Sequence, residues 1–234
     1  MLFRSQVIDA LAVNREVITI DNAGIGNSGG ETPDNVRDMA DIDVSIIKAL
    51  GIGQCDVLGF SLGGFITQTI AVTHSELFRK IILVGTAPQG AEALRSFPAL
   101  TSHAFKLPGA EGYLYLFATP SEPSRAKLKA SLARQSVRKE DRDKPTSMTA
   151  IQQQTKALTR WGVDPVTLDL STVTQPVLII QGSNDPMMGS TASFDLFQKL
   201  PNAFLTYYPD ASHGSFFQYP ELFAVQATHF LDNQ

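Results

Sequence analysis

Apolar residues recur with different periods along the chain, and these periods mark the expected elements. In residues 3–13 they recur at helical spacing, which predicts an amphipathic helix. Residues 16–20 form a short β-branched run that predicts a strand, and the polar, glycine-rich residues 21–31 predict a loop. Thr32 followed by Pro33 is typical of a helix start, so a further helix is expected from there to about residue 50.

Strands and helices then alternate. The expected elements are a strand at 56–60, a helix at 62–74, strands at 80–85 and 177–181, a helix at 190–200, a strand at 203–208 and a helix at 216–231. The strands are almost continuously apolar, as strands buried on both faces are. The fold class predicted is α/β, with a mostly parallel sheet covered by helices on both faces.

The alternation stops at Pro88, and the pattern stays helical to about Pro165. We therefore expect an α/β core formed by residues 1–88 and 166–234, with residues 89–165 as a helical cap. The cap is rich in aromatic residues, most of which should pack on the core while some line an apolar pocket: Phe97, Phe105, Tyr113, Tyr115, Phe117 and Trp161.

Composition excludes several classes of protein. Of 234 residues, 43% are apolar and 18% are charged, so the chain is not a disordered one. The net charge of −4 argues against a general binder of nucleic acid or anionic membranes. Eight Lys and Arg against three acids between Arg125 and Lys144 indicate a solvated helix face, with a bias towards anionic substrates as the alternative. A single cysteine, Cys55, excludes a disulfide framework and a cysteine-based metal cluster, and the scattered histidines show no ligand spacing.

The chain shows no targeting segment. Its start carries Arg4 and Asp9 within a helical pattern, which a signal peptide would not. The longest uncharged run, residues 57–75, contains glycines and hydroxyl side chains and is expected to be a buried strand and helix, with no membrane span. A soluble, cytoplasmic protein is the resulting expectation.

Gly59-Phe60-Ser61-Leu62-Gly63 lies where a buried strand becomes a helix. This is the position of a nucleophile elbow, a sharp turn that exposes a serine Oγ above the sheet. Gly59 and Gly63, two positions on either side of Ser61, are expected to keep side chains from colliding in the turn. A tight packing turn without catalytic meaning is the alternative.

An acid and a base follow later strands in the order that such a serine requires. Asp185 comes just after the strand at 177–181, and His213 lies in the loop after the strand at 203–208. Asp210 is the rival acid and is interpreted as a turn residue. The residues after Gly85 offer no carboxylate. The carboxyl ends of parallel strands collect at one sheet edge, so Ser61, Asp185 and His213 should meet there.

The segments DNAGIGNS (21–28), DVLGFSLGG (56–64) and GSND (182–185) resemble the α/β-hydrolase superfamily, and most of all its esterase and non-haem haloperoxidase-like branch. The resemblance implies Ser61 as nucleophile, His213 as general base and Asp185 as the acid that orients it. It also implies the backbone N–H of Leu62 as an oxyanion donor and no cofactor or metal.

One motif points to another class. Residues 24–29 match the dinucleotide fingerprint G-x-G-x-x-G after an expected strand. That fingerprint requires a helix that opens within the glycines, whereas Thr32 and Pro33 delay the helix here. Its acid should end the next strand, whereas Asp56 begins one. We therefore expect a tight structural turn.

The resemblance begins at what corresponds to the fourth strand of the family. The three earlier strands, and the His-Gly loop that gives the second oxyanion N–H, have no counterpart in this sequence. The strand expected at 16–20 must then pair with residues 56–60, borrow a strand from another chain, or stay at an edge. Weak esterase activity with homodimerisation or low stability is expected for this form, because a missing oxyanion donor costs about 10²–10³ in rate.

The predicted function is hydrolysis of a small, largely apolar carboxylic ester or lactone through an acyl-enzyme on Ser61. Two alternatives stay open. The same triad can use peroxide in place of water, as in a cofactor-free haloperoxidase or perhydrolase. The chain can also be a non-catalytic protein that keeps the triad residues without a working site.

Overall fold

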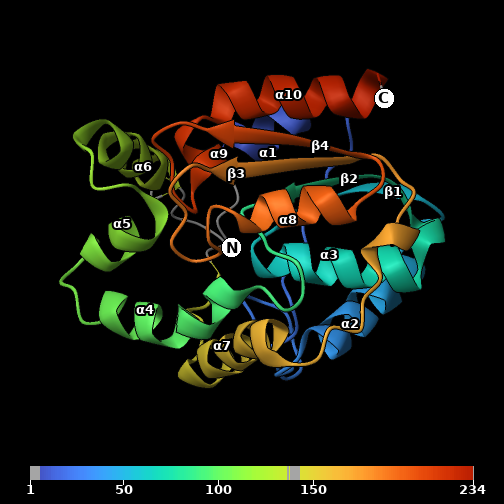
Figure 1. Cartoon of the computed structure of the whole chain (residues 1–234), viewed down its shortest axis with the longest axis horizontal. Helices are drawn as coiled ribbons and strands as arrows, with labels where there is room; N and C mark the ends of the chain where they lie inside the picture. Colours follow the sequence, from blue (N-terminus) through green and yellow to red (C-terminus); the bar gives the residue numbers. More distant parts are fainter. Residues whose placement is uncertain (1–5, 136, 138–142, 234) are drawn as a thin grey trace.

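A computed structural model describes residues 6–135, 137 and 143–233 of the chain. Its centre is a four-stranded sheet of β1 (Cys55–Phe60), β2 (Phe78–Val84), β3 (Val177–Gly182) and β4 (Ala203–Tyr208). The strands lie in the order β1-β2-β3-β4, and every neighbouring pair is parallel (Figure 1). The parallel α/β sheet predicted from the alternation of elements is confirmed.

Helices cover both faces of this sheet. The α-helices are α1 (Gln6–Leu11), α2 (Val36–Ala49), α3 (Leu62–Thr73), α4 (Phe97–Ala104), α5 (Glu111–Phe117), α6 (Glu122–Gln135), α7 (Met148–Val163), α8 (Ala192–Lys199), α9 (Ser215–Gln218) and α10 (Pro220–Asn233). Short 3₁₀ helices span Ser75–Leu77, Glu92–Ser96 and Leu170–Thr172. The last predicted helix, at 216–231, is divided in two, because Pro220 has no N–H to continue the hydrogen bonds of α9.

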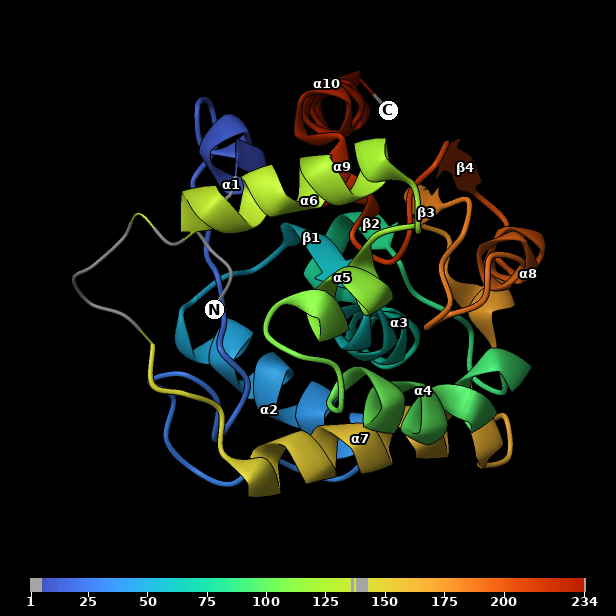
Figure 2. The ribbon, with the colours of Figure 1, turned by 90° about the vertical axis from the view of Figure 1, so that its left-hand side faces the viewer.

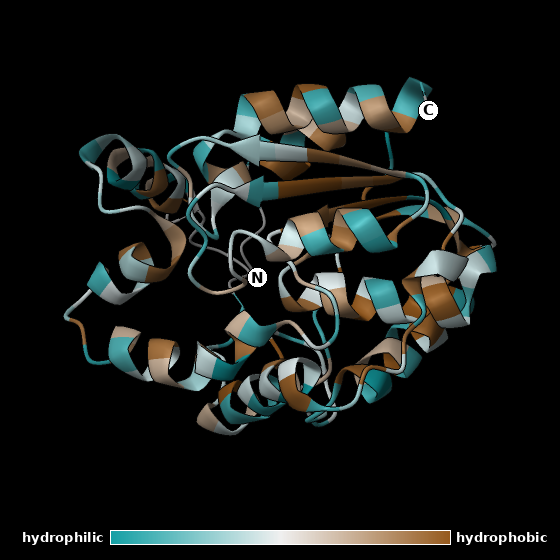
Figure 3. Ribbon diagram, in the orientation of Figure 1, coloured by the Kyte–Doolittle hydropathy of each residue, from teal (hydrophilic) through white to brown (hydrophobic). Residues whose placement is uncertain are grey.

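The strands divide their apolar side chains between two cores. Ile81 and Leu83 of β2 face one core with α2, α3, α7 and α8, whereas Ile82 and Val84 face the other with α1, α9 and α10. This alternation follows from the two-residue period of a strand, and it explains why the strands are apolar along most of their length. Figure 3 shows largely apolar strands between helices that carry both hydrophobic and hydrophilic residues.

The segment between β2 and β3, residues 85–176, is the helical insertion. It contains α4 to α7, and its described residues form no strand. In Figure 2, α4, α5 and α6 lie in front of the strands, on the side to which the carboxyl ends point. The boundaries 89–165 of a separate cap stay a prediction.

The strand predicted at residues 16–20 is wrong. These residues form no strand, and Ile18 is 49% exposed. β1 pairs only with β2 among the described residues, so the segment does not join the sheet at that edge. A β-branched run favours a strand only where a neighbouring strand offers a ladder to pair with.

The predicted helix start at Thr32 is also wrong. α2 begins at Val36, and Asn35 caps it by accepting a hydrogen bond from the N–H of Asp38 at 2.9 Å. The Thr32 hydroxyl instead donates to the carbonyl of Ala23 at 2.8 Å and closes the preceding loop. A threonine before a proline is typical of a helix start, but its hydroxyl can also close a preceding loop. The hydrogen bond from Thr32 to Ala23 shows that the second role applies here.

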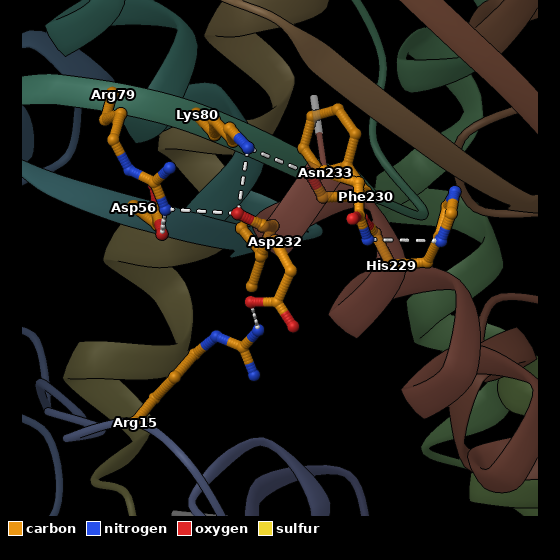
Figure 4. Close-up of polar contacts among 9 residues, drawn as sticks. Arg15, Asp56, Arg79, Lys80, His229, Phe230, Asp232 and Asn233 are labelled. Carbon is orange, nitrogen blue, oxygen red and sulfur yellow. Dashed lines mark hydrogen bonds and ion pairs between the residues drawn. The ribbon is translucent and has the colours of Figure 1, made fainter.

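Two cations at the start of β2 hold the end of α10. The buried Lys80 ammonium donates to the carbonyls of Phe230 and Leu231 at 3.1 and 2.8 Å (Figure 4). Arg79 donates to the same Leu231 carbonyl at 3.2 Å and pairs with Asp56. The last carbonyls of a helix have no partner within it and carry partial negative charge, so α10 is fixed to the sheet at this end. None of the described helices has the length and hydropathy that crossing a membrane requires.

Candidate active site

Three loops leave the carboxyl ends of the strands on the side of α5 and α6. Ser61 follows β1, Asp185 lies in the loop after β3, and His213 lies in the loop after β4. In Figure 1 the strand arrowheads point towards this side. The three candidate residues therefore approach the same sheet edge, although they come from distant parts of the chain.

Ser61 occupies a turn that few residues adopt. Its φ of 55° and ψ of −119° lie outside the ordinary regions for a residue with a side chain. Two contacts to the neighbouring strand end hold it, because its N–H donates to the Val84 carbonyl and its carbonyl accepts from the Thr86 hydroxyl, both at 3.0 Å. A strained backbone fixed in this way is characteristic of functional turns.

Of the two glycines expected to prevent collisions in the turn, only Gly59 lies in a crowded position. A Cβ on Gly59 would lie 2.5 Å from the Thr67 hydroxyl and 2.7 Å from the carbonyl oxygen of Gly63. A Cβ on Gly63, in contrast, would meet no atom within 4 Å. The second tight position is Gly64, where a Cβ would lie 2.4 Å from the Thr86 hydroxyl. The collision expected at Gly63 therefore occurs one residue later, where α3 packs against the end of β2.

Asp185 and His213 form a buried pair. Oδ2 of Asp185 lies 2.9 Å from Nδ1 of His213, and the two residues are 2% and 1% exposed. The other carboxylate oxygen, Oδ1, accepts the N–H groups of Met187 and Met188 at 2.8 and 3.1 Å. With Nδ1 donating to the carboxylate, Nε2 is the nitrogen that can accept a proton.

Aromatic rings and the end of β2 surround the imidazole. The Phe60 and Phe117 rings lie 4.9 and 5.2 Å from it, measured between centroids. A Cβ on Gly85 would come within 3.4 Å of Nδ1 of His213. Phe60 directly precedes Ser61, and Gly85 directly follows Val84, whose carbonyl accepts the Ser61 N–H. Because both residues lie beside the imidazole, the serine turn and the histidine lie side by side.

Asp210 is turned away from His213. Its carboxylate accepts the hydroxyls of Thr119 and Ser121 at 2.6 and 2.5 Å, and these hydrogen bonds lower its pKa. Its φ of 49° places it in the left-handed region, as the interpretation as a turn residue expects. The acid that contacts the imidazole is Asp185.

Leu62 is the first residue of α3, directly after the serine. The first N–H groups of a helix have no partner within it, and the helix N-terminus carries partial positive charge. The backbone N–H of Leu62 thus lies at the positive end of α3, next to Ser61.

The aromatic residues of the insertion separate into three groups. Phe97 and Trp161 are buried, and Trp161 stacks on Phe65 of α3 at 4.9 Å. Phe105 and Tyr115 are 70% and 40% exposed, so they do not pack on the core. The remaining two, Tyr113 and Phe117, stack on each other beside the imidazole.

From the sequence, Thr86 and Phe60 are not expected at the site, and Phe117 is expected only as one of six aromatic residues of which some line an apolar pocket. Ser61 directly follows β1, and Thr86 lies two residues beyond the end of β2. Because neighbouring parallel strands end side by side, this nearness to a strand end was a usable signal. No signal in the sequence distinguishes Phe117 from the other aromatic residues of the insertion.

The loop at residues 21–31 is a compact turn. Gly24 and Gly26 have φ values of 74° and 56°, and a Cβ on Gly26 would lie 2.5 Å from the Asp21 carboxylate. The next helix begins only at Val36, so no helix opens on the glycines as a dinucleotide fingerprint requires. The described residues include no group of three or more His, Cys, Asp or Glu that could hold a metal ion.

Comparison with solved structures agrees with this architecture. An alpha/beta hydrolase fold protein from Chitinophaga pinensis is 46% identical, with a TM-score of 0.96 over 98% of this chain and 83% of that one. A structure titled "Putative non-heme bromoperoxidase BpoC", from Mycobacterium tuberculosis H37Rv, is 22% identical, with a TM-score of 0.78 over 97% of this chain and 85% of that one. At 22% identity, the likeness to the second structure shows the fold alone.

Several curated relatives are hydrolases by name. The 2-hydroxymuconate semialdehyde hydrolase of Pseudomonas putida is 25% identical over 93% of this chain and 77% of that protein. A protein of Rhizobium rhizogenes named "Putative carbamate hydrolase RutD" is 38% identical over 79 residues, which span 33% of this chain and 30% of that relative. The family model described as alpha/beta hydrolase fold matches residues 2–220. The chain therefore belongs to the α/β-hydrolase fold family.

Proposed function

We propose that this α/β-hydrolase cleaves a small, largely apolar carboxylic ester or lactone, with Ser61 as nucleophile, His213 as general base and Asp185 as the orienting acid. The observation that carries the proposal is the buried Asp185–His213 pair beside the strained turn of Ser61. A serine hydroxyl is a weak nucleophile until a base takes its proton, and the imidazole needs a carboxylate to fix its tautomer.

The reaction would proceed in two steps. Ser61 Oγ attacks the ester carbonyl while its proton passes to Nε2 of His213, and the resulting oxyanion is stabilised by the Leu62 N–H. Collapse of this intermediate breaks the bond to the leaving alkoxide, which takes the proton from Nε2, and leaves an acyl group on Ser61. Water then attacks the acyl carbonyl while its proton passes to Nε2 of His213. Collapse of this second intermediate breaks the bond to Ser61 Oγ, which takes the proton back, and releases the carboxylic acid. Phe60 and Phe117 beside the imidazole favour apolar groups on the substrate.

A fluorophosphonate probe and a series of p-nitrophenyl esters of increasing acyl length test the proposal. Wild-type protein should be labelled at Ser61, and Ser61→Ala should abolish both labelling and turnover without unfolding. Asp185→Asn should lower kcat by about 10⁴-fold, because the imidazole loses its tautomer. Labelling that persists in Ser61→Ala would overturn the assignment, and an unlabelled, inactive wild type would support a non-catalytic protein.

The use of peroxide in place of water is the second candidate function, favoured by the name of a curated relative, the "Putative non-heme bromoperoxidase BpoC" of Mycobacterium tuberculosis, which is 27% identical over 92% of this chain. The same three side chains would form a peracid from the acyl-enzyme. Peroxide-dependent bromination that exceeds hydrolysis of the same ester would favour it.

Homodimerisation and a cytoplasmic location belong to the proposal as well. Light scattering measures the mass of the protein in solution, and fractionation of the producing cell locates it. A monomer, or protein outside the cytoplasm, would contradict the respective expectation.

A further inference from the structure

The loop that carries His213 is joined to the helical insertion by side-chain hydrogen bonds. The histidine loop is defined as residues 209–218. The insertion turn is defined as residues 116–124, which run from the last two residues of α5 to the first three of α6. The two segments are about 90 residues apart in the sequence, as the separation of 91 between Thr119 and Asp210 shows. In Figures 1 and 2, α9 at the end of the histidine loop lies beside α6.

Both neighbours of His213 bind the insertion turn. The Ser212 hydroxyl donates to the Leu116 carbonyl at 3.0 Å, and the Gly214 N–H donates to the Phe117 carbonyl at 3.3 Å. The imidazole is therefore held between two contacts to the end of α5. A movement of the insertion turn would change the position of the base.

A buried amide joins the same segments behind the histidine. Nε2 of Gln218 donates to the Ser124 hydroxyl at 2.5 Å, and its Oε1 accepts the Ser212 N–H at 3.1 Å. Ser124 in turn accepts the N–H of Thr119 at 2.9 Å. Gln218 and Ser124 are 3% and 1% exposed, so water cannot easily replace these bonds.

Asp210 supplies the charged contact of this network. Its two carboxylate oxygens each accept a hydroxyl of the insertion turn, from Thr119 and Ser121. A turn residue needs only a backbone that tolerates the left-handed region, which asparagine also does. The capping of α6 needs only the Ser121 oxygen, which accepts the Ser124 N–H at 3.2 Å. Neither role explains a carboxylate with two hydroxyl partners.

We propose that Asp210 is a positioning residue, which fixes the histidine loop to the insertion turn and thereby sets the His213 imidazole relative to Ser61. This inference rests on the proposed function, because only a reaction at Ser61 needs that placement. Hydrogen bonds to a carboxylate are shorter and stronger than neutral ones, so two of them limit the motion of the turn. Misplacement of a catalytic group by 1 Å can cost about 10²-fold in rate.

The test compares Asp210→Asn with Asp169→Asn in the full chain. Asp169 is a matched control, because it is an exposed loop aspartate that accepts the N–H and hydroxyl of Ser171 far from His213 along the chain. Asp210→Asn should lower kcat for a p-nitrophenyl ester by about 10- to 10²-fold per folded molecule, with KM changed much less. Asp169→Asn should leave both constants unchanged. Thr119→Val removes one of the two bonds and should give a smaller loss in kcat.

A second measurement needs no substrate. The proton NMR resonance of the Nδ1–H group of His213 reports its pairing with Asp185, and Asp210→Asn should broaden or shift it while Asp169→Asn leaves it in place. An unchanged resonance and an unchanged kcat in folded Asp210→Asn would overturn the proposal. If wild-type protein hydrolyses no ester, the proposed function fails, and the resonance alone decides whether Asp210 positions the imidazole.

Discussion

Tyr113 carries a buried hydroxyl that has no hydrogen-bond partner among the described residues. Burial raises the pKa of this phenol, and its ring stacks on Phe117 at 4.2 Å between centroids. A buried hydroxyl without a partner costs about 1–3 kcal/mol, because it has lost its hydrogen bonds to water. The packing of Tyr113 against Phe117 comes from its ring, so removal of the hydroxyl should cost no stability.

Tyr113→Phe should therefore leave the free energy of unfolding unchanged or raise it by about 1 kcal/mol. Tyr208→Phe is the control, because the hydroxyl of Tyr208 donates to Gln226 at 2.7 Å, and its removal should lower the free energy of unfolding by about 1 kcal/mol. Urea denaturation measures both. Equal losses in the two variants would show that Tyr113 has a partner.

Asp43 in α2 should make stability depend on pH. Burial raises its pKa from 3.8 to about 6, so the folded protein keeps a proton that the unfolded chain releases near pH 4. The free energy of unfolding should therefore fall as pH rises from about 4 to 6, by up to about 3 kcal/mol.

Asp43→Asn should remove this fall and make the protein more stable than wild type at pH 7. Asp41→Asn, on the exposed side of the same helix, should not. Denaturation at pH 4, 5, 6 and 7 gives the comparison. The expectation would be contradicted if the difference in free energy of unfolding between Asp43→Asn and wild type did not grow from pH 4 to pH 7.

At the level of single residues, the place of a residue at a strand end could be predicted from the sequence, whereas the partners of its side chain could not. Asp185 and His213 could be chosen because each follows a strand, and the structure brings exactly these two into contact. The partners of Asp210 could not be predicted, since Thr119 and Ser121 lie in a turn whose place depends on the packing of α5 and α6.

The strand-to-helix element around Ser61 gives a graded series of glycine substitutions. Gly59→Ala and Gly64→Ala should each destabilise the protein by several kcal/mol or prevent folding, because the new methyl group would lie within 3 Å of fixed atoms. Gly63→Ala should be tolerated, since its methyl group enters open space and alanine favours the helix. Thermal unfolding of the three variants measures the order. Loss of stability in Gly63→Ala equal to that in Gly59→Ala would contradict the geometry.

A strand or helix could be predicted where its own sequence pattern and its neighbours in the fold favour the same structure. β3 is almost entirely apolar and is found where the pattern places it, because it is buried between β2 and β4. Residues 16–20 have the composition of a strand but no neighbouring strand to pair with, and pairing cannot be seen in a local pattern. For the same reason the boundary of α2 depended on a contact of Thr32 across the loop.

For the whole molecule, the alternation of strands and helices was sufficient to predict the parallel sheet and the edge at which Ser61, Asp185 and His213 lie. The stretch without strands between β2 and β3 likewise predicted a helical insertion. What the sequence did not contain was the way the insertion sits on the sheet. That arrangement depends on the contacts of α5 and α6 with the histidine loop, which join residues far apart in the chain.

β2 and β3 are neighbours in the sheet, yet the whole helical insertion separates them along the chain. The entropy lost when a flexible segment closes rises only with the logarithm of its length, by about 0.6 kcal/mol for each doubling. The two strands would thus pair at nearly the same cost with half of the insertion or with twice as much. Selection for stability leaves its length almost free, provided that residues 116–124 keep their hold on the histidine loop. Descendants of this gene can therefore lengthen, shorten or exchange the insertion without rebuilding the sheet.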